Sequence, residues 1–350
     1  MRSRSRTTYG RRFAGGLDRG DQSVSSAPRR LNQQRPGRSD AMGTMILRPS
    51  PPFRLDLTVW ALRRRARNAI DRWDGTTYRR IVVLGRRPTE VAVRQKDRST
   101  GPRLIVTVTP PFRTQLDRQY LRSTIDRLLG VSVDLARWYR AAERDPHLRT
   151  LAHRFRGLKP PRFPTLFETL VNAIACQQLS LIVGLELLNR LAVACDVKRR
   201  TSDGNQLYAF PAPRDLARLS PGAYRAIGFS RQKARALRTL ALGVEGREID
   251  LDRLTSVDDV EASAKLRQLR GVGRWTAEYV LLRGLGRLHV FPGDDVGAQK
   301  SLARWLGRSS RLDYAAVQAA VEAWHPYAGL VYFHLLLDGL SRSGDVKIAV

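Results

Sequence analysis

The spacing of apolar residues changes near residue 130, and this change constrains the fold more than any other feature of the chain. Between about residues 50 and 110, apolar and polar residues alternate in short runs at 55–59, 91–93 and 104–108. Such alternation is typical of strands with one buried face. After Ser132 the apolar residues recur about one helical turn apart. We therefore predict an α+β protein, with a small antiparallel β-sheet domain followed by an all-α bundle.

Three segments follow from this pattern. Residues 1–44 hold ten Arg, three Asp and almost no apolar residues, so we expect a disordered basic tail. Residues 45–130 are expected to form the α+β domain, with a further strand at 80–84, a polar turn at 96–102 and a helix at 115–129. Residues 131–350 are expected to be helical throughout.

The charge of the chain points to a polyanionic partner. Its 62 Lys and Arg residues, mostly Arg, stand against 32 acidic ones, which gives a net charge of +30 and a pI near 11.4. A surface of this kind concentrates polyanions, which favours a nucleic acid as the ligand. The run Arg63–Arg65 is expected to be part of a generic basic face.

Other function classes are disfavoured by composition. Cys176 and Cys195 are too few for a disulfide framework, a four-cysteine zinc site or an iron–sulfur cluster. The five His are scattered, so no metal site is expected. No apolar stretch reaches the roughly 18–20 residues that span a bilayer. We expect a soluble cytoplasmic protein without a membrane association.

The segment 266–282 reads as two helical stretches joined by Gly271-Val272-Gly273. Glycines permit positive φ and a close approach to the backbone, and the first turn of the second helix offers unpaired N–H groups that bind an anion. Arg270 and Arg274 flank this turn, and a DNA phosphate fits it. The alternative is a plain interhelical turn, since glycines commonly end helices.

An acidic pair, Asp294 and Asp295, ends the Gly/Pro-containing loop at 290–296, before another helical stretch. An Asp in this position is usually a helix N-cap. Beside a phosphate-binding hairpin, a carboxylate is also a candidate reactant. Both interpretations stay open on the residues alone.

Residues 164–340 resemble the helix–hairpin–helix DNA glycosylase superfamily, and most of all the DNA-3-methyladenine glycosylase II family. Four ordered motifs carry this resemblance. Residues 167–180 match F-E-x-L-V-x-A-I-x-x-Q-Q-x-S, and 273–279 match G-R-W-T-A-x-Y. Residues 291–295 match the loop that ends in paired Asp, and 324–327 with His334 match W-x-P-[WY]…H. The domain at 50–130 agrees with the family's N-terminal sheet domain in position and length.

The resemblance implies base excision repair, with Asp295 as the catalytic carboxylate. A carboxylate stabilises the oxocarbenium-like sugar that forms as the N-glycosidic bond breaks. The implied substrate is an alkylated purine of the 3-methyladenine or 7-methylguanine class, and the product is an abasic site. Asp294 is expected to be a cap or a spectator. Bifunctional relatives carry a Lys where this chain has Trp275, and an indole forms no imine, so no lyase activity is expected.

Trp275 and Tyr279 lie four residues apart, on one face of the predicted helix. The resemblance makes them walls of the base pocket, where electron-rich rings favour a cationic base. By periodicity alone they are equally well explained as bundle core. Leu336 stands where bacterial relatives carry a pocket aromatic, a departure that bears on the range of substrates.

The remaining expectations concern DNA and cofactors. Gln178 corresponds to the side chain that fills the gap left by the flipped nucleotide. We expect further DNA contacts from Arg270, Gly271, Gly273, Arg274 and Thr276. No redox cofactor is expected, but the resemblance implies a Na⁺ or K⁺ ion on the carbonyls of Arg267, Leu269 and Val272. The expected partner is double-stranded DNA with damaged bases, bound by a monomer. The alternatives are a glycosylase for oxidised or deaminated bases and a non-catalytic damaged-DNA-binding protein.

Overall fold

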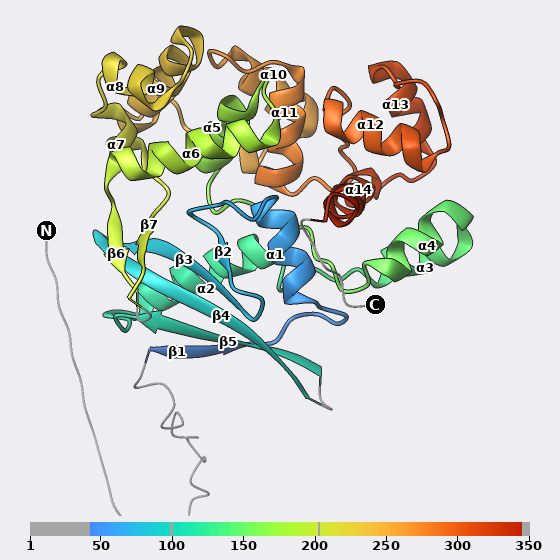
Figure 1. The fold of residues 1–350 in the computed structure, drawn as a ribbon, viewed down its shortest axis with the longest axis horizontal. Coiled ribbons are helices and arrows are strands. Elements are labelled where there is room, and N and C mark those ends of the chain that lie inside the picture. The colour runs from blue at the N-terminus through green and yellow to red at the C-terminus, as the bar shows by residue number, and fades with distance from the viewer. Residues whose placement is uncertain (1–42, 99–100, 202–203, 345–350) are drawn as a thin grey trace, which may run out of the picture. The chain divides into compact units, whose positions relative to one another are not determined.

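A five-stranded antiparallel sheet forms the N-terminal part of the chain (Figure 1). The computed structural model describes residues 43–98, 101–201 and 204–344. The strand order is β1-β5-β4-β3-β2, with β1 at Thr44–Leu47, β2 at Arg72–Trp73, β3 at Thr77–Leu84, β4 at Arg87–Arg98 and β5 at Gly101–Thr109. Residues 1–42 of the predicted tail lie outside the described residues, and Thr44 already belongs to β1. The antiparallel sheet and the strands predicted at 80–84, 91–93 and 104–108 are therefore confirmed.

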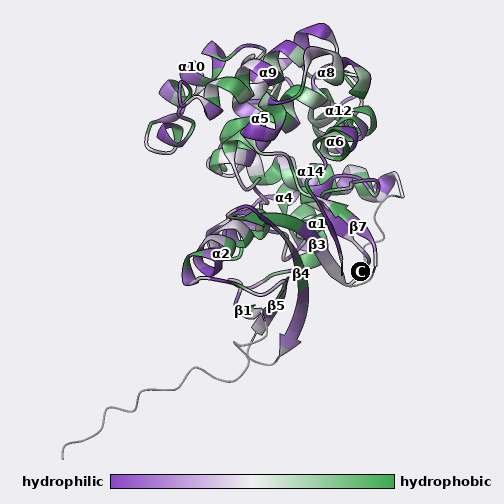
Figure 2. Ribbon diagram, turned by 90° about the vertical axis from the view of Figure 1, so that its left-hand side faces the viewer, coloured by the Kyte–Doolittle hydropathy of each residue, from purple (hydrophilic) through white to green (hydrophobic). Residues whose placement is uncertain are grey.

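Two details of this sheet differ from the prediction. The polar turn expected at 96–102 is shorter, because Lys96 pairs with Arg103 and Asp97 with Pro102 across β4 and β5. Polar side chains do not prevent pairing at the far end of a hairpin, where both faces meet water. Figure 2 shows this hydrophilic end of β4. The short strands β1 and β2 were not predicted, since four and two residues carry too little alternation to recognise.

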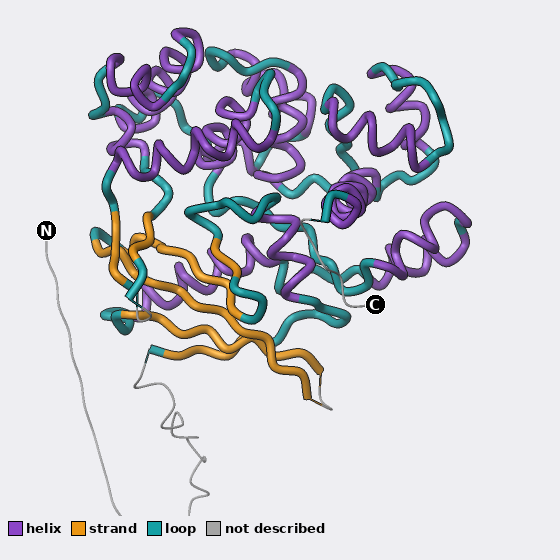
Figure 3. Tube along the Cα trace, viewed as in Figure 1, coloured by secondary structure: helices purple, strands orange, loops and turns teal. Residues whose placement is uncertain are grey.

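The other described elements are mostly helices, which Figure 3 colours purple, whereas the strands are orange. Those before the hairpin are α1 (Leu55–Arg63), α2 (Gln115–Leu129), α3 (Ala136–Arg144), α4 (Pro146–Arg154), α5 (Leu166–Cys176), α6 (Leu181–Cys195), α7 (Pro213–Ala217), α8 (Pro221–Ile227), α9 (Arg231–Glu245) and the 3₁₀ turn η2 (Asp252–Thr255). The hairpin and the C-terminal part contain α10 (Asp259–Gln268), α11 (Arg274–Val280), the π-helical turn η3 (Leu281–Leu285), α12 (Val296–Trp305), α13 (Tyr314–Glu322) and α14 (Ala328–Arg342).

Helix α2 has the predicted bounds because its ends are written in the sequence. Thr114 accepts a hydrogen bond from the backbone N–H of Asp117, and the Asp117 carboxylate accepts one from Thr114 in return. This capping box starts the helix, and Gly130 in the left-handed region (φ 59°) ends it.

The strand predicted over 55–59 is wrong, because these residues form helix α1. Leu55 and Val59 pack in the hydrophobic cluster of the sheet, whereas Leu57 and Ala61 pack in the cluster of α3, α4, α12, α13 and α14. A helix buried on two sides carries apolar residues at positions that need not follow a single stripe. The alternation of 55, 57 and 59 therefore did not indicate a strand.

The prediction that everything after Ser132 is helical is also wrong in one place. Strands β6 (Lys198–Arg200) and β7 (Gln206–Tyr208) form a small antiparallel ribbon. It lies next to the main sheet, where Ile81 of β3 makes a bridge with Ala209 and packs with Leu207 and Ala209. Only three residues of each strand pair, so the sequence carries almost no periodic signal for it.

Two helical clusters form the rest of the core. One is built on α3, α4, α12, α13 and α14, and the other on α5 to α11. Helix α1 contacts both α2 and α14, so the sheet part and the helical part share buried residues. The predicted domain boundary near residue 130 stays a prediction.

Candidate base-excision site

The predicted hairpin is present, and its two glycines differ in what they allow. Helix α10 ends at Gln268, and α11 begins after Gly273. Gly271 has φ +80°, and a Cβ there would lie 2.9 Å from the Cβ of Ala236 on α9. A Cβ at Gly273 would meet nothing within 4 Å. Gly271 therefore fixes the turn against α9, while Gly273 leaves an open approach to the first N–H groups of α11.

The predicted DNA-contacting residues of the hairpin do not all face outward. Arg270, Gly271, Gly273 and Arg274 are exposed, but the Thr276 side chain is buried. Its hydroxyl oxygen accepts a hydrogen bond from Gln177 Nε2 at 2.7 Å. Only the backbone N–H of Thr276 is therefore suited to an anion.

A second turn, between α5 and α6, presents Gln178. This exposed residue has φ +53°, a conformation that non-glycine residues rarely adopt and that is concentrated at functional sites. The turn is held from below by Lys233 Nζ, which donates to the carbonyls of Ala175 (2.9 Å) and Gln177 (2.6 Å). Gln177 Nε2 also donates to the carbonyl of Gly271 at 2.8 Å. The Gln178 turn and the hairpin turn are thus joined directly.

Asp295 uses its two carboxylate oxygens differently. Oδ1 accepts the backbone N–H of Ala298 at 2.9 Å and is the N-cap of α12. Oδ2 accepts the Tyr332 hydroxyl at 3.0 Å and Trp275 Nε1 at 3.4 Å. The two interpretations of this Asp are therefore compatible, because capping occupies one oxygen and the other faces aromatic side chains.

Asp294 is neither a cap nor an idle side chain, so that expectation is corrected. It accepts two hydrogen bonds from Arg274, at 2.7 Å from Nε and 2.9 Å from Nη2. The same guanidinium lies 3.6 Å above the ring centre of Tyr314. The charge of Arg274 is thus matched by Asp294, which lessens what this side chain offers to a phosphate.

Glu278 ties the acidic loop to the neighbouring helices. Its Oε2 accepts the N–H of Gly293 at 3.0 Å, and its Oε1 accepts the Tyr314 hydroxyl at 2.7 Å. Burial raises the pKa of Glu278, although both hydrogen bonds oppose that shift. Burial and the bond to Glu278 raise the pKa of Tyr314 to about 12, so its hydroxyl is a donor at neutral pH. The loop is therefore clamped between α11 and α13.

The aromatic pair of α11 lies beside Asp295. The rings of Trp275 and Tyr279 are 5.4 Å apart, centre to centre, with 35° between their planes. Trp275 is half-buried, whereas Tyr279 is buried and belongs to the cluster of the sheet. Leu336, half-buried on α14, packs instead with the cluster of α3, α4 and α12 to α14.

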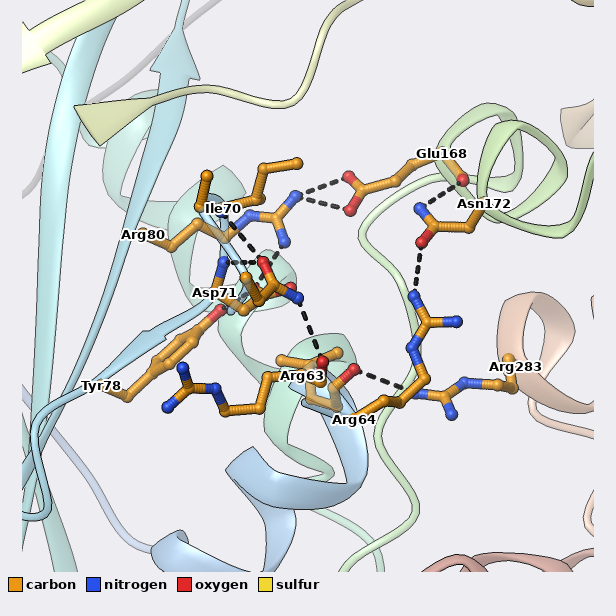
Figure 4. A network of polar contacts seen from close by, with 12 residues as sticks. Arg63, Arg64, Ile70, Asp71, Tyr78, Arg80, Glu168, Asn172 and Arg283 are labelled. Atoms are coloured by element: carbon orange, nitrogen blue, oxygen red, sulfur yellow. Dashed lines mark hydrogen bonds and ion pairs between the residues drawn. The ribbon is translucent and has the colours of Figure 1, made fainter. Parts of the chain in front are cut away.

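Arginines expected on a basic face lie behind this pair, so the expectation for Arg63–Arg65 is wrong for the first two. Arg63 and Arg64 are each 4% exposed. Arg64 donates to the Tyr279 hydroxyl at 3.1 Å. It also donates to Asn172 Oδ1 at 2.7 Å (Figure 4). Arg64, at the end of α1, therefore links α5 to α11 at the site.

Figure 4 shows the buried network next to it, where Arg80 of β3 reaches Glu168 of α5. Arg80 Nη2 lies 2.6 and 2.7 Å from the two Glu168 oxygens, and Nη1 lies 2.8 Å from Asp71. These carboxylates outweigh the effect of burial and hold the pKa of Arg80 well above its usual value. The network fixes α5, and with it the Gln178 turn, on the sheet.

Sequence reasoning missed Tyr332, Arg64 and Glu278. Tyr332 sits in an apolar helical run, and Arg64 sits in a run of three Arg, so each carries the signal of another role. Glu278 occupies the variable position of the matched motif. In the described parts of the chain, no group of three or more His, Cys, Asp and Glu side chains could hold a metal ion. No helix there is both long and apolar enough to cross a bilayer.

Comparisons with known proteins agree with this geometry. Residues 171–326 match the HhH-GPD superfamily of base excision DNA repair proteins. The DNA-3-methyladenine glycosylase of Bacillus subtilis is 27% identical over 225 residues, which cover 63% of this chain and 74% of that protein. DNA-3-methyladenine glycosylase 2 of Escherichia coli is 32% identical over 181 residues, which cover 51% of this chain and 60% of that protein.

The fold has a counterpart among solved structures. The 3-methyladenine DNA glycosylase of Archaeoglobus fulgidus superposes with a TM-score of 0.72 at 24% identity, covering 87% of this chain and 99% of that one. This likeness extends across both the sheet part and the helical part, although at such identity it shows the fold alone. Residues 171–326 are thus similar to the helix–hairpin–helix superfamily of base excision DNA repair proteins, and the two relatives above are DNA-3-methyladenine glycosylases.

Proposed function

We propose that this protein is a DNA glycosylase of base excision repair that removes alkylated purines of the 3-methyladenine and 7-methylguanine class from duplex DNA. The observation that carries the proposal is the position of Asp295 Oδ2, which lies within hydrogen-bond reach of Trp275 and Tyr332. A carboxylate beside aromatic rings supplies what the reaction needs: negative charge for the sugar and π faces for a cationic base.

In this mechanism the hairpin binds a DNA phosphate through the backbone around Gly273, and the exposed Gln178 fills the gap left by the flipped nucleotide. Because Gln177 joins the two turns, phosphate binding and gap filling occur on one rigid element. The extruded base stacks on Trp275 and Tyr279. Asp295 then stabilises the oxocarbenium-like sugar and orients the water that attacks C1′, and an abasic site remains.

The proposed enzyme is monofunctional. The residue after Arg274 is Trp275, and an indole cannot form the imine that strand cleavage requires. Base release without strand breaks, and without a covalent complex trapped by borohydride, is the expected behaviour. Strand cleavage without alkali would contradict it.

We further propose that the protein acts as a monomer, at the nucleoid, without a redox cofactor. A Na⁺ or K⁺ ion on the carbonyls of Arg267, Leu269 and Val272 would add positive charge beside the bound phosphate. The residues fit such an ion, because α10 ends at Gln268 and carbonyls in a last helical turn lack i+4 donors. The Leu269 carbonyl accepts one hydrogen bond from within the described residues, at 3.1 Å from the Val272 N–H, and this bond uses one of its two lone pairs.

The test compares two Asp residues that cap helices in the same way. Asp313 caps α13 by accepting the N–H of Ala316 at 2.8 Å, as Asp295 caps α12, but no aromatic side chain of the described residues donates to it. Asp295→Asn is expected to slow release of 3-methyladenine and 7-methylguanine from methylated duplex DNA by at least about a hundredfold. Asp313→Asn is expected to lose similar stability and to keep its activity.

An Asp295→Asn protein that releases bases at the wild-type rate would refute the catalytic assignment. Tight binding to DNA with no release of any methylated base by the wild type would favour the alternatives. A panel of oxidised and deaminated bases then separates a glycosylase of other specificity from a binding protein.

A further inference from the structure

Tyr332, in the middle of α14, is the closer of the two side-chain donors to Oδ2 of the carboxylate that we assign to catalysis. Its side chain is 8% exposed, and its hydroxyl lies 3.0 Å from Asp295 Oδ2. Burial and the nearby Asp295 charge raise the pKa of Tyr332 well above its usual value. The phenol therefore keeps its proton at neutral pH and donates a hydrogen bond to the carboxylate.

The bond to Tyr332 is not needed to cap α12. The Ala298 N–H already satisfies the helix terminus through Oδ1. The Tyr332 ring packs edge-on against Phe291 at 5.5 Å and Phe333 at 5.9 Å, surroundings that a Phe would fill equally well. A hydroxyl in such a place costs free energy unless it is hydrogen-bonded, so its presence points to the acceptor, Asp295.

Tyr332 also supplies an aromatic ring near the proposed base pocket, whereas Leu336 supplies none. The two residues lie one helical turn apart on α14, so they share a side of the helix. Tyr332 and Trp275 donate to the same oxygen of Asp295, and their polar atoms therefore flank one carboxylate.

We propose that Tyr332 orients the Asp295 carboxylate for base excision and forms the third aromatic wall of the base pocket, together with Trp275 and Tyr279. The proposal rests on the proposed function. The hydroxyl holds Oδ2 on the side of the sugar, and the ring contacts the flipped base. Substitutions at one position separate the two roles, because Phe removes only the hydroxyl and Leu removes the ring as well.

A matched control exists in the other helical cluster. Tyr224 is fully buried, and its hydroxyl donates to the carbonyl of Leu216 at 2.8 Å. Tyr224→Phe therefore removes a comparable buried hydrogen bond from a residue that contacts neither Asp295 nor the aromatic pair.

The experiment measures single-turnover release of 7-methylguanine from duplex DNA, and the affinity for a duplex that carries a tetrahydrofuran abasic analogue. Tyr332→Phe is expected to release the base about ten- to a hundredfold more slowly, as for loss of one hydrogen bond to a charged group, with unchanged affinity for the analogue. Tyr332→Leu is expected to lose a further two- to fivefold in release rate, because the base of the substrate would no longer stack on the ring. The abasic analogue has no base to stack, so this loss is not expected in its affinity. Tyr224→Phe is expected to match the wild type in both.

Each other outcome is decisive. Wild-type release by Tyr332→Phe overturns the orienting role, and so does an affinity for the abasic analogue that falls in parallel with the rate, since that result indicates a merely structural role. Equal release rates for the Tyr332→Phe and Tyr332→Leu variants would refute the proposal that the Tyr332 ring forms a wall of the base pocket. Asp295→Asn is measured beside them. If the wild type is active and Asp295→Asn inactive, a normal Tyr332→Phe refutes this inference alone, whereas an inactive wild type refutes the proposed function and this inference with it.

Discussion

Gly293, in the loop that carries Asp295, is a position where one methyl group is expected to damage catalysis more than folding. Its φ lies outside the left-handed region, so backbone strain is not the reason for a glycine here. The reason is space. A Cβ on Gly293 would lie 2.7 Å from Cδ2 of Tyr314 and 2.7 Å from Nε2 of Gln318, distances at which one of the groups must move.

The Tyr314 ring is poorly able to move. The Arg274 guanidinium covers it at 3.6 Å, and its hydroxyl is bonded to Glu278. The loop itself is held by Gly293, whose N–H donates to Glu278 and whose carbonyl accepts from Gln299 at 2.8 Å. We therefore expect the loop to shift and to carry Asp295 with it.

Overpacking of this kind costs about 1–3 kcal/mol of folding free energy. For a chain of 350 residues the melting temperature would fall by roughly 1–2 °C per kcal/mol. The effect on catalysis is expected to be larger, because a displacement of about 1 Å at a reacting group can cost a hundredfold in rate. Gly293→Ala is thus expected to remain folded at 25 °C and to release 7-methylguanine about a hundredfold more slowly.

Gly222, in α8, provides the control, since the nearest atom to a Cβ there is Ser220 Oγ at 3.7 Å. Gly222→Ala is expected to leave both the melting temperature and the rate nearly unchanged. Single-turnover release and thermal unfolding of the two variants are compared with the wild type. A Gly293→Ala protein with the wild-type rate would show that the loop does not set the position of Asp295.

Two further outcomes follow from buried groups. Burial lowers the pKa of His334 to about 4, whereas an exposed His titrates near 6.5, so between these two pH values only the unfolded chain binds the proton. The free energy of unfolding should therefore be full above pH 6.5 and fall by about 3 kcal/mol toward pH 4. Urea unfolding of His334→Asn over the same pH range should show a loss that is smaller by this amount. Gln177→Ala removes the bonds to Gly271 and Thr276 that join the Gln178 turn to the hairpin turn. Because we propose that both turns bind DNA, this variant is expected to bind duplex DNA about tenfold more weakly in fluorescence anisotropy, without unfolding. Unchanged affinity would contradict a coupling of the turns.

The sequence predicts those elements that have one buried face or clear ends. Strand β5 alternates because Leu104, Val106 and Val108 face the core, and α2 begins and ends at a capping box and a glycine. Helix α1 was misread because its residues face two different cores. The β6–β7 ribbon was missed because three paired residues per strand leave no period to detect.

At the site, the sequence predicts what lies in motifs and misses what arrives from a distance. The hairpin and the loop with Asp295 are contiguous segments with recognisable spacing. The bond between Arg64 and Tyr279 spans 215 residues, and Tyr332 reaches Asp295 across 37. Neither Arg64 nor Tyr332 has neighbours in the sequence that distinguish it from a surface arginine or a core tyrosine, so only the folded chain identifies them.

The two interpretations of Asp295 left open by the sequence are one arrangement in the structure. A carboxylate that caps a helix through Oδ1 has its side-chain torsions fixed, and the direction of Oδ2 is then fixed as well. In the proposed reaction, capping therefore prepares the group for chemistry, because an oriented charge needs no rearrangement as the sugar becomes positive. The Glu278 and Tyr314 clamp serves the same end from the other side of the loop. Holding one carboxylate in place thus draws on α11, α12, α13 and α14, four helices that are separate in the sequence.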